Sequence, residues 1–122
     1  MGRVQRLPHR LHGPGVHAGL IHAIDGTEPL RDGGYRPGMQ IDEFQQLMDR
    51  LYGDADRERG MPSTVAWLCE EVGELAQAVR KGSRDDQLHE LGDVLAWLAS
   101  LANQLGLSLE EAAQRYVVDP PA

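Results

Sequence analysis

Two pairs of acidic residues have the side-chain types and the spacing that could do chemistry in this sequence. Glu71 and Glu74 form one pair, and Glu90 and Asp93 form the other. Residues three positions apart share a face of an α-helix, with Cβ atoms about 5–6 Å from each other. Four converging carboxylates would repel one another unless a divalent cation lay between them, and ligands made only of oxygen suit Mg²⁺ or Mn²⁺ rather than Zn²⁺. The spacing therefore favours a metal centre, with a solvated acidic helix face as the alternative.

Helices must position these carboxylates, and helical patterns follow one another after residue 39. We expect helices over about 42–59, 63–81, 84–106 (or from Ser83) and, as a short fourth, 108–117. Capping boxes are expected at Asp42 with Gln45 and at Ser108 with Glu111. No alternating run predicts a strand. The predicted fold class is therefore all-α, with three longer helices and one short helix in each chain.

The two middle helices also carry apolar residues at steps of three and four, which is typical of a packed helix face. In the second helix these are Val65, Leu68, Val72, Leu75 and Val79, and in the third they are Leu88, Leu91, Leu95, Leu98, Ala102 and Leu105. Each acidic pair lies on a neighbouring stripe. The short turn at Gly82 favours antiparallel packing, so the two acidic pairs are expected to face each other.

Composition limits the class of protein. The chain has 122 residues, 41% hydrophobic content and a net charge of −7, which fits one domain and argues against binding to a nucleic acid polymer. No apolar run is long enough to cross a membrane, and the N-terminus lacks the apolar region of a secretory signal. The single cysteine, Cys69, excludes an internal disulfide and is expected to be buried. A reduced, cytoplasmic setting fits these features.

Residues 1–38 differ from the rest. They hold eight of the fourteen glycines and four of the seven prolines, and their charge is +2 against −9 for residues 39–122. We expect a disordered or weakly ordered N-terminal extension followed by one domain over 39–122. His9, His12, His17 and His22 are interpreted as a solvated tail rather than a metal site. A transit peptide, or a natural start at Met39, remains open.

The segments Glu70-Glu71-Val72-Gly73-Glu74 and Glu90-Leu91-Gly92-Asp93 occur in an order that resembles the EExxE and ExxD motifs of the MazG family of nucleoside triphosphate pyrophosphohydrolases. The resemblance extends over about residues 41–116. It implies an all-α, oligomeric hydrolase that uses Mg²⁺, with Mn²⁺ as a possible substitute. Such an enzyme cleaves an NTP or dNTP between the α- and β-phosphates into the monophosphate and pyrophosphate, a reaction that cleans nucleotide pools.

The resemblance also implies roles for individual residues. The family's catalytic, metal-binding acids correspond to Glu71, Glu74, Glu90 and Asp93. Glu70 would point about 100° away from Glu71 and would either support the site or be solvated.

Other residues are candidates for binding the substrate. Trp97 is interpreted either as a base-stacking residue or as a residue buried at a subunit seam, and Trp67 either as base-stacking or as a core residue. Lys81 and Arg84 would hold distal phosphates or would form a solvated turn. Asn103 would contact sugar or phosphate, or would have a capping or interface role.

The alternatives differ in substrate or in class. One alternative is an enzyme of the same superfamily that acts on dUTP or phosphoribosyl-ATP. The other is a non-catalytic helical dimerisation module. A di-iron centre is set aside, because its pattern needs Glu-x-x-His on two helices and His89 offers only one related motif. A unit of this size has too few helices to cover all of its faces. A homodimer or dimer of dimers that completes the helical bundle is therefore expected.

Overall fold

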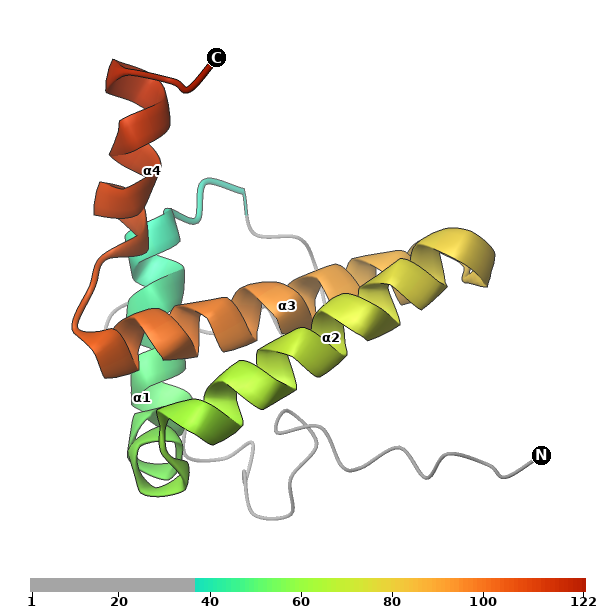
Figure 1. The fold of residues 1–122 in the computed structure, drawn as a ribbon, viewed down its shortest axis with the longest axis horizontal. Coiled ribbons are helices and arrows are strands. Elements are labelled where there is room, and N and C mark those ends of the chain that lie inside the picture. The colour runs from blue at the N-terminus through green and yellow to red at the C-terminus, as the bar shows by residue number, and fades with distance from the viewer. Residues whose placement is uncertain (1–36) are drawn as a thin grey trace. The chain divides into compact units, whose positions relative to one another are not determined.

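The computed structural model describes residues 37–122, and residues 1–36 of the predicted N-terminal extension, with its four histidines, lie outside this range. Gly38–Ala122 form one compact unit. Its elements are α1 (Ile41–Arg59), α2 (Met61–Lys81), α3 (Arg84–Leu105) and α4 (Leu109–Val118), shown in Figure 1. This part of the chain contains three long helices, one short helix and no strand, which confirms the all-α prediction. Its helices are all too short or too polar to span a membrane.

Helices α2 and α3 lie side by side as an antiparallel hairpin, and α1 crosses α3 (Figure 1). A small apolar core fills the contact between α1 and α3, where Met48 packs with Ala96 and Ala99. The two alanines allow the helix backbones to approach closely. Partly buried side chains of α1, among them Phe44 and Leu51, extend this core. Helix α1 thus covers one side of α3, and α2 packs against another side of α3.

The turn between α2 and α3 is made tight by Gly82. A Cβ atom at this position would lie 2.8 Å from the carbonyl oxygen of Ala78, which is too close for any side chain. The next residue, Ser83, begins α3 by accepting a hydrogen bond from the backbone N–H of Asp86 at 3.1 Å. In return, the Asp86 carboxylate accepts one from the Ser83 N–H at 2.9 Å. These local bonds fix the direction in which α3 returns along α2.

Two predicted helix starts are wrong. Helix α1 begins at Ile41, and its first turn is closed by Glu43, whose carboxylate accepts a hydrogen bond from the N–H of Gln40 at 3.3 Å. Asp42, the expected cap, is therefore the second residue of the helix. Helix α2 begins at Met61 instead of Ser63, directly after Gly60 with φ +88°. Pro62 fits the first turn because no hydrogen bond from its nitrogen is needed there.

The apolar stripes of α2 and α3 are packed only in part within the chain. Their most exposed members include Val79, at 65%, and Leu88, at 67%. The others with more than a third of their surface exposed are Val65, Val72, Leu91, Leu95, Leu98 and Leu105. Cys69, predicted to be buried, is exposed as well. The reason is that α2 and α3 meet through the neighbouring stripe, which carries the acids, so the apolar stripes turn outward.

Both outward stripes lie on the same side of the hairpin. Each residue of an α-helix advances by about 100°, which puts Val72 and Leu91 on the flanks of their helices relative to the acids. In both helices the apolar residue follows the acid by one position, as Val72 follows Glu71 and Leu91 follows Glu90. Because the helices are antiparallel, this equal rotation turns both apolar stripes to the same side of the hairpin. We call this surface the outer apolar face; its members are Val65, Cys69, Val72 and Val79 of α2 and Leu88, Leu91, Leu95, Leu98 and Leu105 of α3.

Candidate metal and nucleotide site

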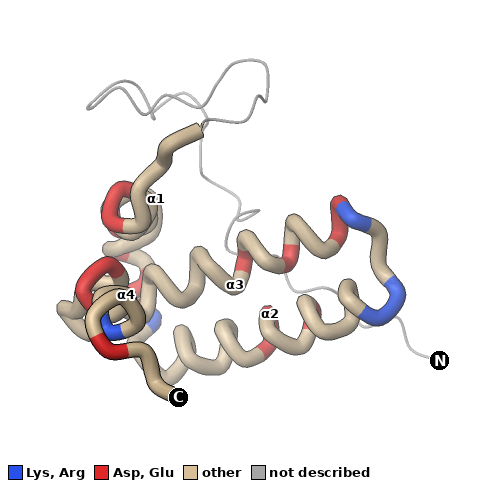
Figure 2. Tube along the Cα trace, turned by 90° about the horizontal axis from the view of Figure 1, so that it is seen from above, with Lys and Arg blue, Asp and Glu red and all other residues tan. Residues whose placement is uncertain are grey.

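The four predicted carboxylates converge between α2 and α3. Glu71 is 0% exposed, Asp93 3% and Glu90 6%, and Glu74 is half-buried. Carboxylate oxygens of Glu71, Glu74 and Glu90 lie within 4.8 Å of one another. Figure 2 shows the acidic positions of the two helices along the hairpin. The antiparallel turn thus brings together acids from two helices, of which the first, Glu71, and the last, Asp93, are 22 positions apart in the sequence.

The pKa of Glu90 reflects its burial and the negative charges around it. Its pKa is raised above the ordinary glutamate value, first by desolvation and then by the negative charge of Glu74, while His89 acts in the opposite direction. The Oε2 atom of Glu90 is buried and has no hydrogen-bond partner among the described residues. A divalent cation beside these oxygens would compensate their charge and give that buried atom a partner. The residues present therefore fit a hard cation bound by oxygen ligands.

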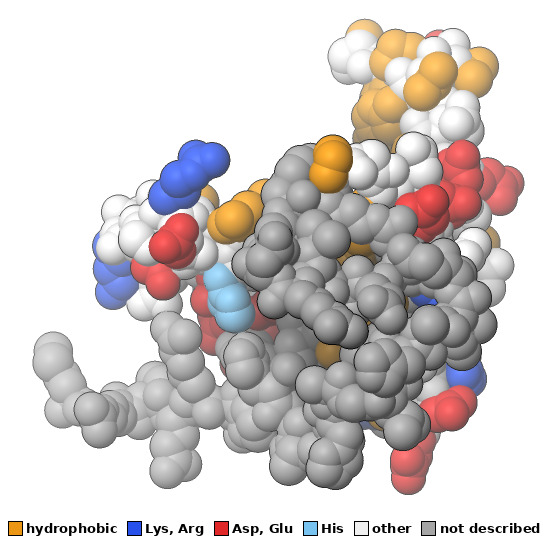
Figure 3. Space-filling model, turned by 180° about the vertical axis from the view of Figure 1, so that it is seen from behind, with side chains coloured by type: hydrophobic (Ala, Val, Ile, Leu, Met, Phe, Trp, Pro, Cys, Tyr) orange, Lys and Arg blue, Asp and Glu red, His pale blue; other side chains and the backbone are white. Residues whose placement is uncertain are grey.

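His89 is a neighbour of this site that the sequence interpretation left out of it. Its Nε2 atom lies 3.2 Å from Oδ2 of Asp93, one helical turn further along α3. The same nitrogen-bearing ring, together with Glu90 and Asp93, places ligand atoms within 4.8 Å of one another. Figure 3 shows histidine and carboxylate side chains next to each other on this face of the molecule. The signal in the sequence was the spacing of four between His89 and Asp93.

The two tryptophans form a stack beside the acids. The rings of Trp67 and Trp97 are 5.7 Å apart between centroids and 7° from parallel. Trp97 is 2% exposed, so a base could not stack on it without displacing its present neighbours. Trp67 is half-buried. Trp97 is therefore already buried inside one chain, before any second subunit is added.

Arg59 was not identified from the sequence, although it joins this stack. Its guanidinium carbon lies 5.1 Å from the centroid of the Trp97 ring, within cation–π range. Its Nη1 atom also lies 2.9 Å from Oδ1 of Asp56, whose side chain is almost fully buried. The C-terminal end of α1 is thereby tied to the tryptophan of α3. The charged segment Arg57-Glu58-Arg59 was the available signal in the sequence, and it does not indicate a contact with Trp97.

Lys81 and Arg84 lie at the turn of the hairpin, on the side of the acids away from the two tryptophans. Lys81 ends α2, Arg84 begins α3, and both are exposed. Along the helix axes, Lys81 is about 10 Å from Glu74 and Arg84 about 9 Å from Glu90. Figure 2 shows these basic positions at the turn of the hairpin. The order along α2 and α3 is therefore turn cations, carboxylates, tryptophans.

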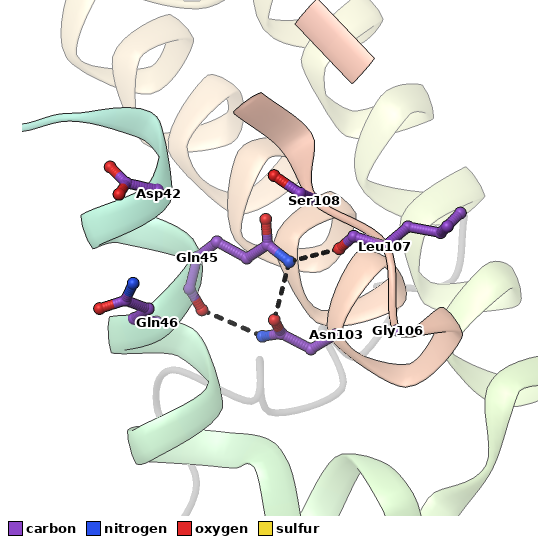
Figure 4. Close-up of a pocket in the computed structure, with 7 residues that line it drawn as sticks. All are labelled: Asp42, Gln45, Gln46, Asn103, Gly106, Leu107 and Ser108. Atoms are coloured by element: carbon purple, nitrogen blue, oxygen red, sulfur yellow. Dashed lines mark hydrogen bonds between the residues drawn. The ribbon is translucent and has the colours of Figure 1, made fainter. Parts of the chain in front are cut away.

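Asn103 belongs to a different region. It lies about 15 Å along α3 from Asp93. Its side chain donates to the carbonyl oxygen of Gln45 and accepts from the Gln45 amide, both at 3.0 Å. Figure 4 shows these bonds and a third one, from the same Gln45 amide to the carbonyl oxygen of Leu107. The Oε1 atom of Gln45 also accepts a hydrogen bond from the N–H of Leu109, so α1 holds the start of α4. These bonds place Asn103 in a contact between α1 and the end of α3 within one chain.

The fold and the site together define an all-α protein with a buried cluster of acids between two antiparallel helices. Residues 59–118 match the MazG nucleotide pyrophosphohydrolase domain. The chain belongs to this family. The matched range begins at Arg59, contains all four carboxylates and ends with α4.

The chain is also similar to three curated proteins. It is 39% identical over 84 residues to the uncharacterized protein YpjD of Bacillus subtilis, covering 60% of this chain and 76% of that protein. It is 38% identical over 74 residues to the Gene 37 protein of Mycobacterium phage L5, covering 52% of this chain and 65% of the phage protein. The uncharacterized protein YvdC of Bacillus subtilis is 33% identical over 95 residues, with 64% and 90% covered. Their names assign no substrate.

Proposed function

We propose that this protein is a Mg²⁺-dependent nucleoside triphosphate pyrophosphohydrolase, with Mn²⁺ as a possible substitute. One observation carries the proposal: three buried carboxylates and one half-buried carboxylate meet between α2 and α3 in a member of the MazG family. Burying so much negative charge without a counter-ion is costly. A binding site for a cation that itself carries a polyphosphate explains why the acids are there.

The reaction needs positioning and charge compensation more than covalent chemistry. Glu71, Glu74, Glu90 and Asp93 would hold the divalent cation, which supplies compensation for the triphosphate charge when bound. A water molecule adds to phosphorus, and the bond from that phosphorus to the oxygen bridging the α- and β-phosphates breaks. One of the carboxylates accepts the proton of the water. The products are the nucleoside monophosphate and pyrophosphate.

The order of residues along the hairpin suggests how the nucleotide lies. Lys81 and Arg84 are within reach of the distal phosphates, because their long side chains begin about 9–10 Å from the acids. The base would then be directed toward the opposite end, where the half-buried Trp67 offers more of its ring than Trp97. We assign no substrate contact to Asn103, whose amide is used in the bonds to Gln45.

A second copy of the chain is part of this proposal. The outer apolar face would be an unusually large apolar surface for an isolated molecule, and contiguous patches of that kind mark interfaces. Its position on α2 and α3, on the flank of the acidic site, makes a homodimer or dimer of dimers the arrangement that completes the helical bundle. A reduced cytoplasmic setting, where nucleotides are found, fits such an enzyme.

A pyrophosphate-release screen over ribo- and deoxynucleoside triphosphates, with Mg²⁺ and with Mn²⁺, tests the function. We expect release of pyrophosphate from at least one nucleotide, and none when the metal is chelated. dUTP and phosphoribosyl-ATP belong in the screen, because they would reveal a different specificity at the same site. A folded protein that hydrolyses none of them, and whose stability does not respond to metal, would instead be a helical dimerisation module.

A further inference from the structure

The acidic site contains one potential ligand that is not an oxygen. Among the described residues, two groups of side chains bring ligand atoms within 4.8 Å of one another. One group is Glu71, Glu74 and Glu90, and the other is His89, Glu90 and Asp93. Glu90 belongs to both. The first group offers oxygen alone, whereas the second adds an imidazole nitrogen.

We propose that His89 is a metal ligand, so that the site offers two unequal cation positions that share Glu90: one of oxygen ligands only and one of mixed nitrogen and oxygen. This proposal rests on the proposed function, since it concerns the same metal site. Its chemical consequence is a change in metal preference. Imidazole is typical of transition-metal sites, and Mg²⁺ takes oxygen ligands. Mn²⁺ also takes oxygen ligands, but as a transition-metal ion it accepts a nitrogen ligand more readily than Mg²⁺ does. The position with His89 would favour Mn²⁺ over Mg²⁺.

The geometry supports a ligand role in two ways. The Nε2 atom of His89 already lies 3.2 Å from the buried carboxylate of Asp93, so nitrogen and oxygen donors converge from one face of α3. Glu90 belongs to both groups, and its Oε2 atom is buried without a hydrogen-bond partner in the described part of the chain. An atom in this situation is suited to bridge or complete a cation position.

The exposure of His89 also agrees with this role. Its side chain is 44% exposed, whereas Asp93 is 4% exposed at the side chain. The ring therefore stands at the solvent-exposed rim of the acidic site. A side chain at the rim can turn toward the cation without disturbing the packing of α2 against α3.

Pulsed electron paramagnetic resonance on the full-length protein with Mn²⁺ alone tests the proposal, because a directly bound nitrogen modulates the electron spin echo of Mn²⁺. We expect a nitrogen coupling in the wild type that is lost in His89→Gln. The matched control is His22→Gln, which removes a histidine from the N-terminal segment. It should keep the coupling. Gln has no imidazole but retains a polar side chain of moderate size.

Metal titration gives a second readout. The ratio of the Mg²⁺ to the Mn²⁺ dissociation constant should fall by about tenfold in His89→Gln, because Mn²⁺ affinity decreases more than Mg²⁺ affinity. Mn²⁺ bound to the wild type without a nitrogen coupling would overturn the proposal and leave the oxygen site of the proposed function intact. A wild-type protein that binds no Mn²⁺ at a stoichiometric site would overturn both.

Discussion

Trp67 and Trp97 stack 5.7 Å apart, each one helical turn from an acid of the candidate metal site. Trp67 precedes Glu71 on α2 by four residues, and Trp97 follows Asp93 on α3 by four. The contact therefore joins the two helices at the level next to the carboxylates. The attraction between the rings opposes the repulsion between the acids, which would otherwise push α2 and α3 apart.

Replacing Trp97 by alanine should lower the free energy of unfolding by about 3–5 kcal/mol, the usual cost of emptying a buried aromatic site. Trp67→Ala should cost less, since the Trp67 ring is half-buried. Urea unfolding at one fixed protein concentration measures both. A loss for Trp97→Ala that is no larger than for Trp67→Ala would contradict the importance of the burial of Trp97.

Glu74→Gln and Asp93→Asn should each reduce turnover by at least about a hundredfold, because loss of one metal ligand removes several kcal/mol of charge stabilisation. Helix content should be unchanged, since both substitutions conserve side-chain volume. Glu70→Gln is the matched control: Glu70 is an exposed neighbour of Glu71, and its loss should leave turnover near the wild-type value. Wild-type turnover in either ligand variant would exclude the assigned metal site.

The stability of the metal-free protein should fall as the pH rises. The pKa of Glu90 is raised in the folded chain, so the folded state binds this proton more tightly than the unfolded state does. The resulting stabilisation is complete below the ordinary glutamate pKa and is lost as the pH passes through the raised pKa. Urea unfolding in the presence of a chelator, from mildly acidic to neutral pH, measures the decline.

Two comparisons isolate the contribution of Glu90. The variant Glu90→Gln cannot lose this proton, and its metal-free stability should decline less over the same pH range. Saturating Mg²⁺ should oppose the decline in the wild type, because the metal binds the deprotonated carboxylates. Equal slopes for wild type and variant would show that the buried carboxyl does not control this pH dependence.

Leu91→Glu should dissociate the proposed homodimer, raising its dissociation constant by at least about tenfold, because the charge would be buried without a partner. Leu91 is exposed within one chain, so the substitution should leave the helices of the monomer intact. Ala55→Glu, on an exposed position of α1, serves as the control. Sedimentation velocity over a range of concentrations distinguishes the two. A wild-type protein that sediments as a folded, active monomer at these concentrations would rule out the dimer.

A protein that starts at Met39 should fold and hydrolyse the same nucleotides as the full chain. The reason is that the helical patterns and all four carboxylates lie after this residue. Circular dichroism and pyrophosphate release at equal protein concentration measure the two properties. Insolubility, or a clear loss of turnover, would mean that residues 1–38 contribute to the domain.

The sequence was sufficient for the helices because their patterns are local. Alternating steps of three and four, Gly60, Gly82 and Ser108 located each helix to within a few residues. The start of α1 was wrong because two chemically similar caps competed there. Gln40 with Glu43 was chosen over Asp42 with Gln45, and the amide of Gln45 instead binds Asn103 and Leu107. Such a choice depends on tertiary contacts that no local pattern records.

The acidic cluster was predictable because spacing of three on two antiparallel helices determines which side chains converge. The partners of the cluster were harder to predict. Arg59 reaches Trp97 from another helix, and His89 gains its meaning only from its contact with Asp93. The outward direction of the apolar stripes could not be read from periodicity alone, because periodicity gives the face of a helix and not the surface that the face meets.

The tight turn at Gly82 limits how far the two acidic helices can open. The glycine closes one end of the hairpin, and the stacked indoles join it on the other side of the carboxylates. The opening between the acids is thus closed at both ends, which should keep the distance between the two helices nearly constant. Ca²⁺ needs longer bonds and more ligands than Mg²⁺, so accommodating it would require the helices to separate at one of these two points. Gly82, which touches no metal ligand, would in this way help to select a cation by its radius.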